Sequence, residues 1–166
     1  MESVTSYHQL GKFIVLFQNI EEQIDDLILL LTNSDDELIS ILINQMEFSQ
    51  KIKKLDVIFA RFVDKKENTG KFDKNDFHSF INKVIKQCER RNALVHSRYY
   101  SWLNIEGKEG LLRENAKNSA KKGLREIKEE EILPEDLAKD IEKIEEYIEN
   151  FDKHRNRITD WLGEFG

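Results

Sequence analysis

The sequence predicts an all-α fold: an antiparallel bundle of four long helices (up to five), with a small β-hairpin between the third and fourth. Two observations carry this prediction. The 166 residues include one proline and seven glycines, which is few turn formers for a β fold. Apolar residues also recur three and four positions apart over long stretches, which is the period of one helix face. Because no repeat or dividing linker interrupts this pattern, a single domain over residues 1–166 is expected.

Two apolar stripes separated by a short polar segment predict the first two helices. The first helix is expected over residues 6–31, and the second is expected to end near Val63. Ser34 followed three positions later by Glu37 has the spacing of a capping box, which marks the start of the second helix. Residues 65–71 are polar and contain a glycine, so they are predicted to form a loop.

The third helix is predicted to begin after Asp73, which can cap it, and to end near Arg98. Its core-facing stripe is expected to consist of Phe77, Ile81, Val84, Ile85, Cys88 and Val95. Its outward face is assigned to four charged residues, Lys83, Lys86, Glu89 and Arg90.

An aromatic segment follows the third helix. Residues 99–105, a glycine-containing turn and a second extended piece over residues 111–114 predict the small hairpin. Residues 115–122 are polar and show no periodicity, so an exposed loop is expected there. Pro134 stands where proline fits best, in the first turn of a helix, and this last helix is predicted to run to about Gly163.

Composition limits the classes of function. The formal net charge of −6 argues against coating nucleic acid through a global positive field, but it is compatible with a local basic pocket. The single cysteine, Cys88, is interpreted as a small buried hydrophobe. The densest apolar run is too short to span a bilayer and the N-terminal segment lacks a signal-peptide pattern, so a cytoplasmic protein without membrane contact is expected. The other histidines show no metal-ligand spacing, so neither a metal nor a cofactor is expected.

The segment Arg-Asn-Ala-Leu-Val-His near the end of the third helix is the most informative part of the chain. Counted at about 100° per residue, Arg91 and Asn92 fall on the two margins of the apolar stripe, and His96 lies one turn after Asn92. Polar groups at a core margin cost free energy unless each finds a partner. They therefore indicate a functional site, or Arg91 forms an ion pair with Glu21 or Glu22 of a neighbouring helix.

Arg91 and His96, with four residues between them and late in a long helix, resemble the signature of the HEPN superfamily (higher eukaryotes and prokaryotes nucleotide-binding). Asn92 fits the polar residue that usually follows the arginine in that family. Its members are all-α bundles of four or five helices. One subfamily of toxins has a tyrosine two positions after the histidine, and this chain departs from that pattern because the position is Arg98, with Tyr99 one step later.

The resemblance implies a metal-independent endoribonuclease. Many family members dimerise so that the motifs of two subunits build one composite cleft. Carried over to this chain, Arg91 and His96 are the catalytic pair, while Asn92, Arg98 and Tyr99 are binding candidates. The implied context is a toxin–antitoxin or phage-defence system, with an RNA such as tRNA as substrate and an antitoxin or other protein as a further partner. Two alternatives stay open: a non-catalytic dimeric module that binds RNA, a nucleotide or a protein, and an interaction module in which Arg91 is structural.

The chemistry of the two side chains suits RNA cleavage. Histidine titrates near neutral pH and can remove the proton of a 2′-hydroxyl, whereas arginine stays charged and matches two phosphate oxygens. Cleavage by the 2′-oxygen leaves a 2′,3′-cyclic phosphate. The aromatic residues Tyr99, Tyr100 and Trp102 either stack on unpaired bases or pack the hairpin onto the bundle, and packing is expected for at least two of them.

Overall fold

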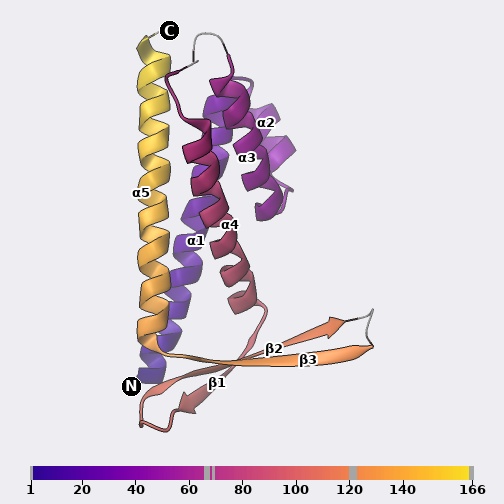
Figure 1. Ribbon diagram of the computed structural model, residues 1–166, viewed down its shortest axis with the longest axis vertical. Coiled ribbons are helices and arrows are strands. Elements are labelled where there is room, and N and C mark those ends of the chain that lie inside the picture. The colour runs from indigo at the N-terminus through magenta and orange to yellow at the C-terminus, as the bar shows by residue number, and fades with distance from the viewer. Residues whose placement is uncertain (1, 66–67, 69, 120–122, 165–166) are drawn as a thin grey trace. The chain divides into compact units, whose positions relative to one another are not determined.

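The computed structural model describes residues 2–65, 68, 70–119 and 123–164. Within this part of the chain, the elements follow one another in the order shown in Figure 1: α1 (Glu2–Thr32), α2 (Asp36–Ile43), α3 (Phe48–Val63), α4 (Lys74–Val95), β1 (Arg98–Leu103), β2 (Glu109–Ser119), β3 (Leu124–Ile132) and α5 (Pro134–Glu164).

The prediction of an all-α bundle with only a small hairpin is wrong. The described residues form five helices and a three-stranded antiparallel sheet of order β1-β2-β3, so the fold is a mixture of α and β. The predicted hairpin is present as β1 and the first part of β2, but residues 115–119, predicted as loop, continue β2, and β3 pairs along its whole length. The rest of that predicted loop, residues 120–122, lies outside the described residues.

The physical reason for this error is solvation of both faces of β3 over most of its length. Side chains 124–129 of β3 are all exposed, and only the last part of the strand is covered. A strand whose two faces are both exposed to solvent lacks the alternation of apolar and polar residues that identifies a strand from sequence.

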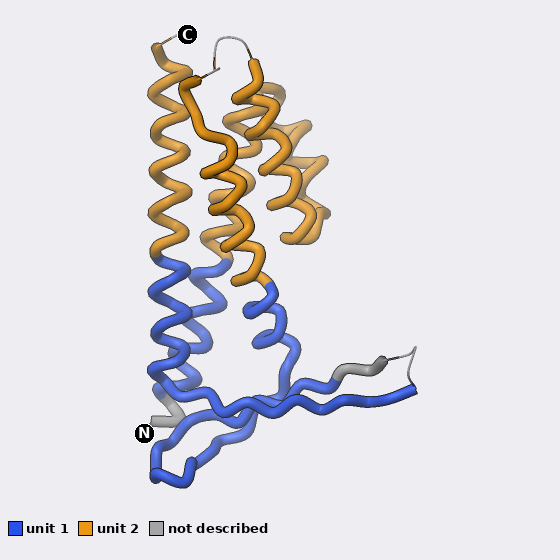
Figure 2. The backbone as a smooth tube through the Cα atoms, in the orientation of Figure 1, with its two compact units in different colours: residues 1–17, 89–145 blue, residues 18–88, 146–166 orange. Residues whose placement is uncertain are grey.

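The chain forms two compact units, each made of two separate segments (Figure 2). The first unit comprises residues 1–17 and 89–145, and the second comprises residues 18–88 and 146–166. The sheet belongs to the first unit, whereas α2 and α3 belong to the second. Three long helices, α1, α4 and α5, contribute residues to both units.

In the first unit, one end of the sheet is buried. Leu111 of β2 pairs in register with Ile132 of β3, and both side chains are essentially inaccessible to solvent. A Cβ atom at the preceding Gly110 would lie 2.6 Å from the carbonyl oxygen of Ile132. Only glycine therefore fits where β2 enters the sheet.

In the second unit, aromatic rings form the centre of the core. Phe59 of α3 stacks on Phe77 of α4 with ring centroids 3.9 Å apart, and His154 of α5 approaches Phe77 edge-on at 5.0 Å. Burial lowers the pKa of His154. Cys88 is buried as the sequence predicts.

The predicted second helix is in fact two helices. The predicted capping box does not start it, because Asp35 is the N-cap residue of α2 and its carboxylate accepts a hydrogen bond of 3.0 Å from the Leu38 N–H. In one continuous helix, Ile43 and Ile52 would point about 180° apart. Both are buried, so the interruption between α2 and α3 is what allows both side chains to reach the core.

Other local predictions are confirmed. Asp73 caps α4, since its carboxylate accepts hydrogen bonds from the N–H groups of Asn75 and Asp76 at 2.8 and 3.0 Å. Pro134 begins α5. Of the predicted loop 65–71, residues 66, 67 and 69 lie outside the described part. None of the helices described is long and apolar enough to cross a membrane.

Candidate functional site

The buried face of α4 changes in its last two turns. Four residues of the predicted stripe are buried, Phe77, Ile81, Val84 and Cys88, and Ile85 is half-buried. Val95, predicted to face the core, is instead 38% exposed, and its neighbour Leu94 is completely buried. Arg90, assigned to the outward face from the sequence, lies four residues before Leu94 and is partly buried. The end of the helix therefore presents a different set of side chains to its surroundings than helical counting from Phe77 predicts.

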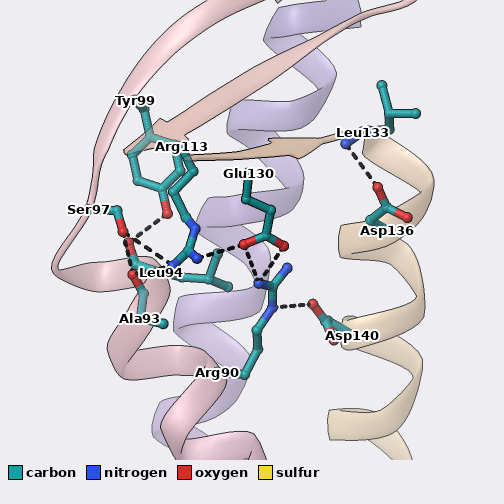
Figure 3. A network of polar contacts seen from close by, with 10 residues as sticks. All are labelled: Arg90, Ala93, Leu94, Ser97, Tyr99, Arg113, Glu130, Leu133, Asp136 and Asp140. Atoms are coloured by element: carbon teal, nitrogen blue, oxygen red, sulfur yellow. Dashed lines mark hydrogen bonds and ion pairs between the residues drawn. The ribbon is translucent and has the colours of Figure 1, made fainter. Parts of the chain in front are cut away.

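Arg90 is held by two carboxylates of the first unit (Figure 3). Its Nε donates to Asp140 of α5 at 3.0 Å, and its terminal nitrogen donates to both carboxylate oxygens of Glu130 of β3, at 2.8 and 3.0 Å. Burial alone would lower the pKa of Arg90, but the hydrogen bonds and charges of Asp140 and Glu130 outweigh it and raise the pKa. Carboxylates of the protein therefore neutralise its charge, and Arg90 is not available to bind a ligand.

A second arginine, Arg113, binds the carbonyl end of α4. Arg113 of β2 is 8% exposed and forms an ion pair with Glu130 at 2.7 Å. It also donates to the Ala93 carbonyl at 2.9 Å and to the Ser97 hydroxyl at 3.3 Å (Figure 3). The last carbonyls of a helix have no partner within the helix, and a cation there is favoured by the helix dipole. Arg113 thus fixes the last turn of α4 to the sheet.

Tyr99 also binds the carbonyl end of α4. Its hydroxyl donates to the carbonyl of Leu94 at 2.6 Å, and burial raises its pKa to about 12. Tyr99, a binding candidate from the sequence, therefore already uses its hydroxyl proton in a hydrogen bond within the protein. Its position indicates that Tyr99 helps to hold the end of the helix, whereas the neighbouring Tyr100 is 47% exposed.

Arg91 lies over an aromatic ring instead of being enclosed by acidic side chains. Its guanidinium carbon is 5.7 Å from the ring centroid of Phe17, and one terminal nitrogen donates to the side-chain oxygen of Asn92 at 3.0 Å. Its Nε is buried and has no hydrogen-bond partner among the residues that the structure describes. Glu21, one of the two acidic partners considered from the sequence, instead accepts from Lys51 at 3.1 Å. Arg91 therefore keeps unmatched positive charge near the surface.

His96 follows the last residue of α4. Its N–H still donates to the Asn92 carbonyl at 3.1 Å, so the helical hydrogen-bond pattern extends to it. The side chain is exposed, and its ring forms no hydrogen bond with any other residue in the described ranges. Helix geometry separates positions 91 and 96 by about 7.5 Å along the axis and about 140° around it. One chain therefore supplies an accessible imidazole and a guanidinium at the same helix end, on different sides.

Beyond the helix, three residues of β1 alternate onto one face of the sheet. Arg98, Tyr100 and Trp102 are all exposed, and Tyr99 between them points to the helix. The Trp102 indole donates to Glu131 of β3 at 3.0 Å. Of the three aromatic residues, Tyr99 donates to the end of the helix, whereas Tyr100 and Trp102 are 47% and 38% exposed.

Sequence reasoning missed the residues that position the site, Arg90, Arg113, Glu130 and Asp140. Arg90 was obscured by the change of buried face, and Arg113 and Glu130 lie on strands for which the sequence shows weak signals. An arginine in the last two turns of a helix, followed by a strand with a second arginine, is the one signal that was available.

The described residues contain no group of three or more His, Cys, Asp and Glu side chains that could hold a metal ion. Comparison with protein-family models, curated proteins and solved structures found no match for the chain.

Proposed function

We propose that the protein is a metal-independent endoribonuclease of HEPN type that acts as a homodimer. One observation supports this proposal above the others. The end of α4 presents the exposed imidazole of His96 and the guanidinium of Arg91, which lies over the Phe17 ring without a carboxylate partner among the described residues. The interactions of Arg113 and Tyr99 with the end of the helix would keep both groups in place during reaction.

In the proposed reaction, His96 removes the proton of a 2′-hydroxyl, and the 2′-oxygen attacks the adjacent phosphorus. The bond from phosphorus to the 5′-oxygen breaks, and that oxygen takes a proton from water. The products are a 2′,3′-cyclic phosphate and a 5′-hydroxyl end. Arg91 stabilises the charge that develops on the phosphate, which is commonly the largest contribution in such sites. Because the two positions face different sides of one helix, the pair that acts on one phosphate comes from two subunits.

The proposed setting is the cytoplasm, in a toxin–antitoxin or phage-defence system. Asn92 orients Arg91, and Arg98 supplies a further contact to phosphate from the first residue of β1. The net charge of −6 favours a narrow substrate, such as one loop of a tRNA, over broad degradation of RNA. A non-catalytic module that binds RNA is the second candidate, favoured by the engagement of the Arg91 side chain with Asn92 and Phe17 within the protein.

Cleavage of total RNA and tRNA by the purified protein in EDTA tests the proposal. We expect cutting that leaves cyclic-phosphate ends, and a loss of at least about 100-fold in the variants Arg91→Ala and His96→Ala. The exposed residues Arg125 and His8 provide matched controls, and Arg125→Ala and His8→Ala should cut like the unmodified protein. RNA binding without cutting would instead support the non-catalytic module.

A further inference from the structure

Helix α2 has apolar side chains on two opposite faces. Ile43 is buried, as the inner face of a short helix on a core should be. Leu38, Ile41 and Leu42 are 54%, 66% and 57% exposed. Spacings of three and four place these three residues on one side of the helix, called here the outer face of α2. Large aliphatic side chains that gather on one exposed face indicate an interaction surface, whereas isolated ones do not.

A pocket adjoins this face within the second unit. It has a volume of about 390 Å³ and is formed by α1, α2 and the residue that ends α2. Its apolar lining comes from Leu29, Ile41 and Ile43, and two acidic residues, Asp25 and Glu37, also line it. The outer face of α2 therefore continues into a depression that can receive a side chain with an apolar stem.

The segment of the chain that carries this surface is strongly acidic. The 38 residues between Lys12 and Lys51 contain eight carboxylates and no lysine, arginine or histidine. Part of this charge is neutralised, because Lys51 pairs with Asp25 at 2.9 Å and with Glu21 at 3.1 Å, and Arg155 pairs with Asp26 at 3.6 Å. Asp36 and Glu37 at the start of α2 are exposed and form no ion pair with another residue in the described ranges. Counted at about 100° per residue, Glu37 lies beside Ile41 at the margin of the outer face, whereas Asp36 lies on the side of Ile43. Glu37 therefore provides a rim of unneutralised negative charge along one side of the apolar face.

The negative charge of the rim decides which class of molecule can bind to this surface. RNA and anionic lipid surfaces would be repelled by it. A second copy that docked through the same face by two-fold symmetry would bring one acidic rim against another. A polypeptide helix with aliphatic residues on one side and lysine or arginine beside them satisfies both the apolar face and the rim.

We propose that the outer face of α2 and its pocket bind a basic amphipathic helix of a partner protein. The surface lies in the second unit, and the proposal does not depend on the ribonuclease proposal, which rests on residues of the first unit. Aliphatic side chains of the partner cover Ile41 and Leu42, and a cation of the partner faces Glu37.

A designed pair of peptides tests this proposal on the full chain. The probe is a fluorescein-labelled 14-residue peptide of leucine and lysine with leucines at helical spacing, and the control peptide has glutamate in place of every lysine. Fluorescence anisotropy should show binding of the lysine peptide that weakens as salt increases, and no binding of the glutamate peptide. Equal binding of both peptides, or of neither, would overturn the proposal.

Variants then locate the binding site. Ile41→Ser combined with Leu42→Ser should weaken the affinity for the lysine peptide by about tenfold or more, because both positions are on the surface and their replacement leaves the core intact. Glu37→Gln, which removes the charge at the margin of the outer face, should weaken it by a factor of about three and reduce its dependence on salt. The fully exposed Ile105 provides the control, and Ile105→Ser should leave affinity unchanged.

Two results would contradict the assignment. An affinity that is the same in the Ile41→Ser, Leu42→Ser variant and in Ile105→Ser would place the peptide elsewhere. A concentration-dependent mass in light scattering that the Ile41→Ser, Leu42→Ser variant alone abolishes would identify a second copy as the occupant. Far-UV circular dichroism of each variant confirms that the helices are retained.

Discussion

Replacement of Arg113 by methionine tests whether the interactions of this residue hold the end of α4. The guanidinium of Arg113 interacts with Glu130, with the Ala93 carbonyl and with the Ser97 hydroxyl, and its side chain is only 10% exposed. Methionine retains an apolar stem of similar length and removes these polar contacts. Each hydrogen bond that involves a charged group contributes about 1.5–3 kcal/mol.

The expected loss is smaller than a sum of these contacts. Glu130 remains paired with Arg90, and the Ala93 carbonyl still accepts from the Ser97 hydroxyl, so neither acceptor is left without a partner. The contact with Ser97, at 3.3 Å, is long. We therefore expect Arg113→Met to lower the free energy of unfolding of the first unit by about 2–4 kcal/mol. Arg125→Met, at an exposed position of β3, should change it by less than about 0.5 kcal/mol.

Urea denaturation followed by tryptophan fluorescence measures this change. The sequence has two tryptophans, and one lies in each unit, Trp102 in the first and Trp161 in the second. In a Trp161→Phe background, the fluorescence reports on the first unit through Trp102. Amide hydrogen exchange should accelerate at His96, because its N–H donates the last helical hydrogen bond, to the Asn92 carbonyl. A loss of stability below about 0.5 kcal/mol, with unchanged exchange at His96, would refute the reasoning.

Three further changes test other parts of the structure. Gly110→Ala should lower the free energy of unfolding by about 1–3 kcal/mol in urea denaturation, because its Cβ would lie 2.6 Å from the Ile132 carbonyl oxygen; an unchanged midpoint would contradict that close approach. Lys51→Met leaves the partly buried carboxylate of Asp25 without its cation, so the free energy of unfolding should fall by about 2–4 kcal/mol at pH 7. Because burial raises the pKa of Asp25, its carboxylate takes up a proton near pH 4, and the decrease should be smaller there. Because burial lowers the pKa of His154, the unfolded chain binds more protons below about pH 6.5, and the melting temperature should fall from pH 7.5 to 5.5 more steeply in the unmodified protein than in His154→Phe. Equal slopes would show that His154 is not the group responsible.

The long helices are predictable from the sequence because their burial is regular. Phe13, Phe17, Ile20 and Ile24 of α1 are all buried, so the three-and-four spacing of apolar residues corresponds directly to the structure. The cap of α4 and the start of α5 at Pro134 are local and follow from single residues.

Errors arise where distant contacts decide the structure. The break before Phe48 contains no proline or glycine and is explained by the burial of Ile43 and Ile52 on opposite helical faces. Strand β3 exists because it pairs with β2, which a solvated, charged segment does not reveal by itself. Arg90 is turned inward by Glu130 and Asp140, which follow it in sequence by 40 and 50 positions. The spacing of Arg91 and His96 can be read from the sequence, whereas the residues that hold the end of α4 cannot, because they come from distant strands.

Mixing of inactive subunits tests the composite site most directly. Cleavage of tRNA in EDTA is measured for the unmodified protein, for Arg91→Ala, for His96→Ala, and for the two variants mixed and allowed to exchange subunits. If Arg91 of one subunit and His96 of the other act on one phosphate, each variant alone is inactive, and the mixture regains cutting with 2′,3′-cyclic phosphate ends. A mixture as inactive as its components would contradict the composite cleft, and no cutting by the unmodified protein would contradict the ribonuclease itself.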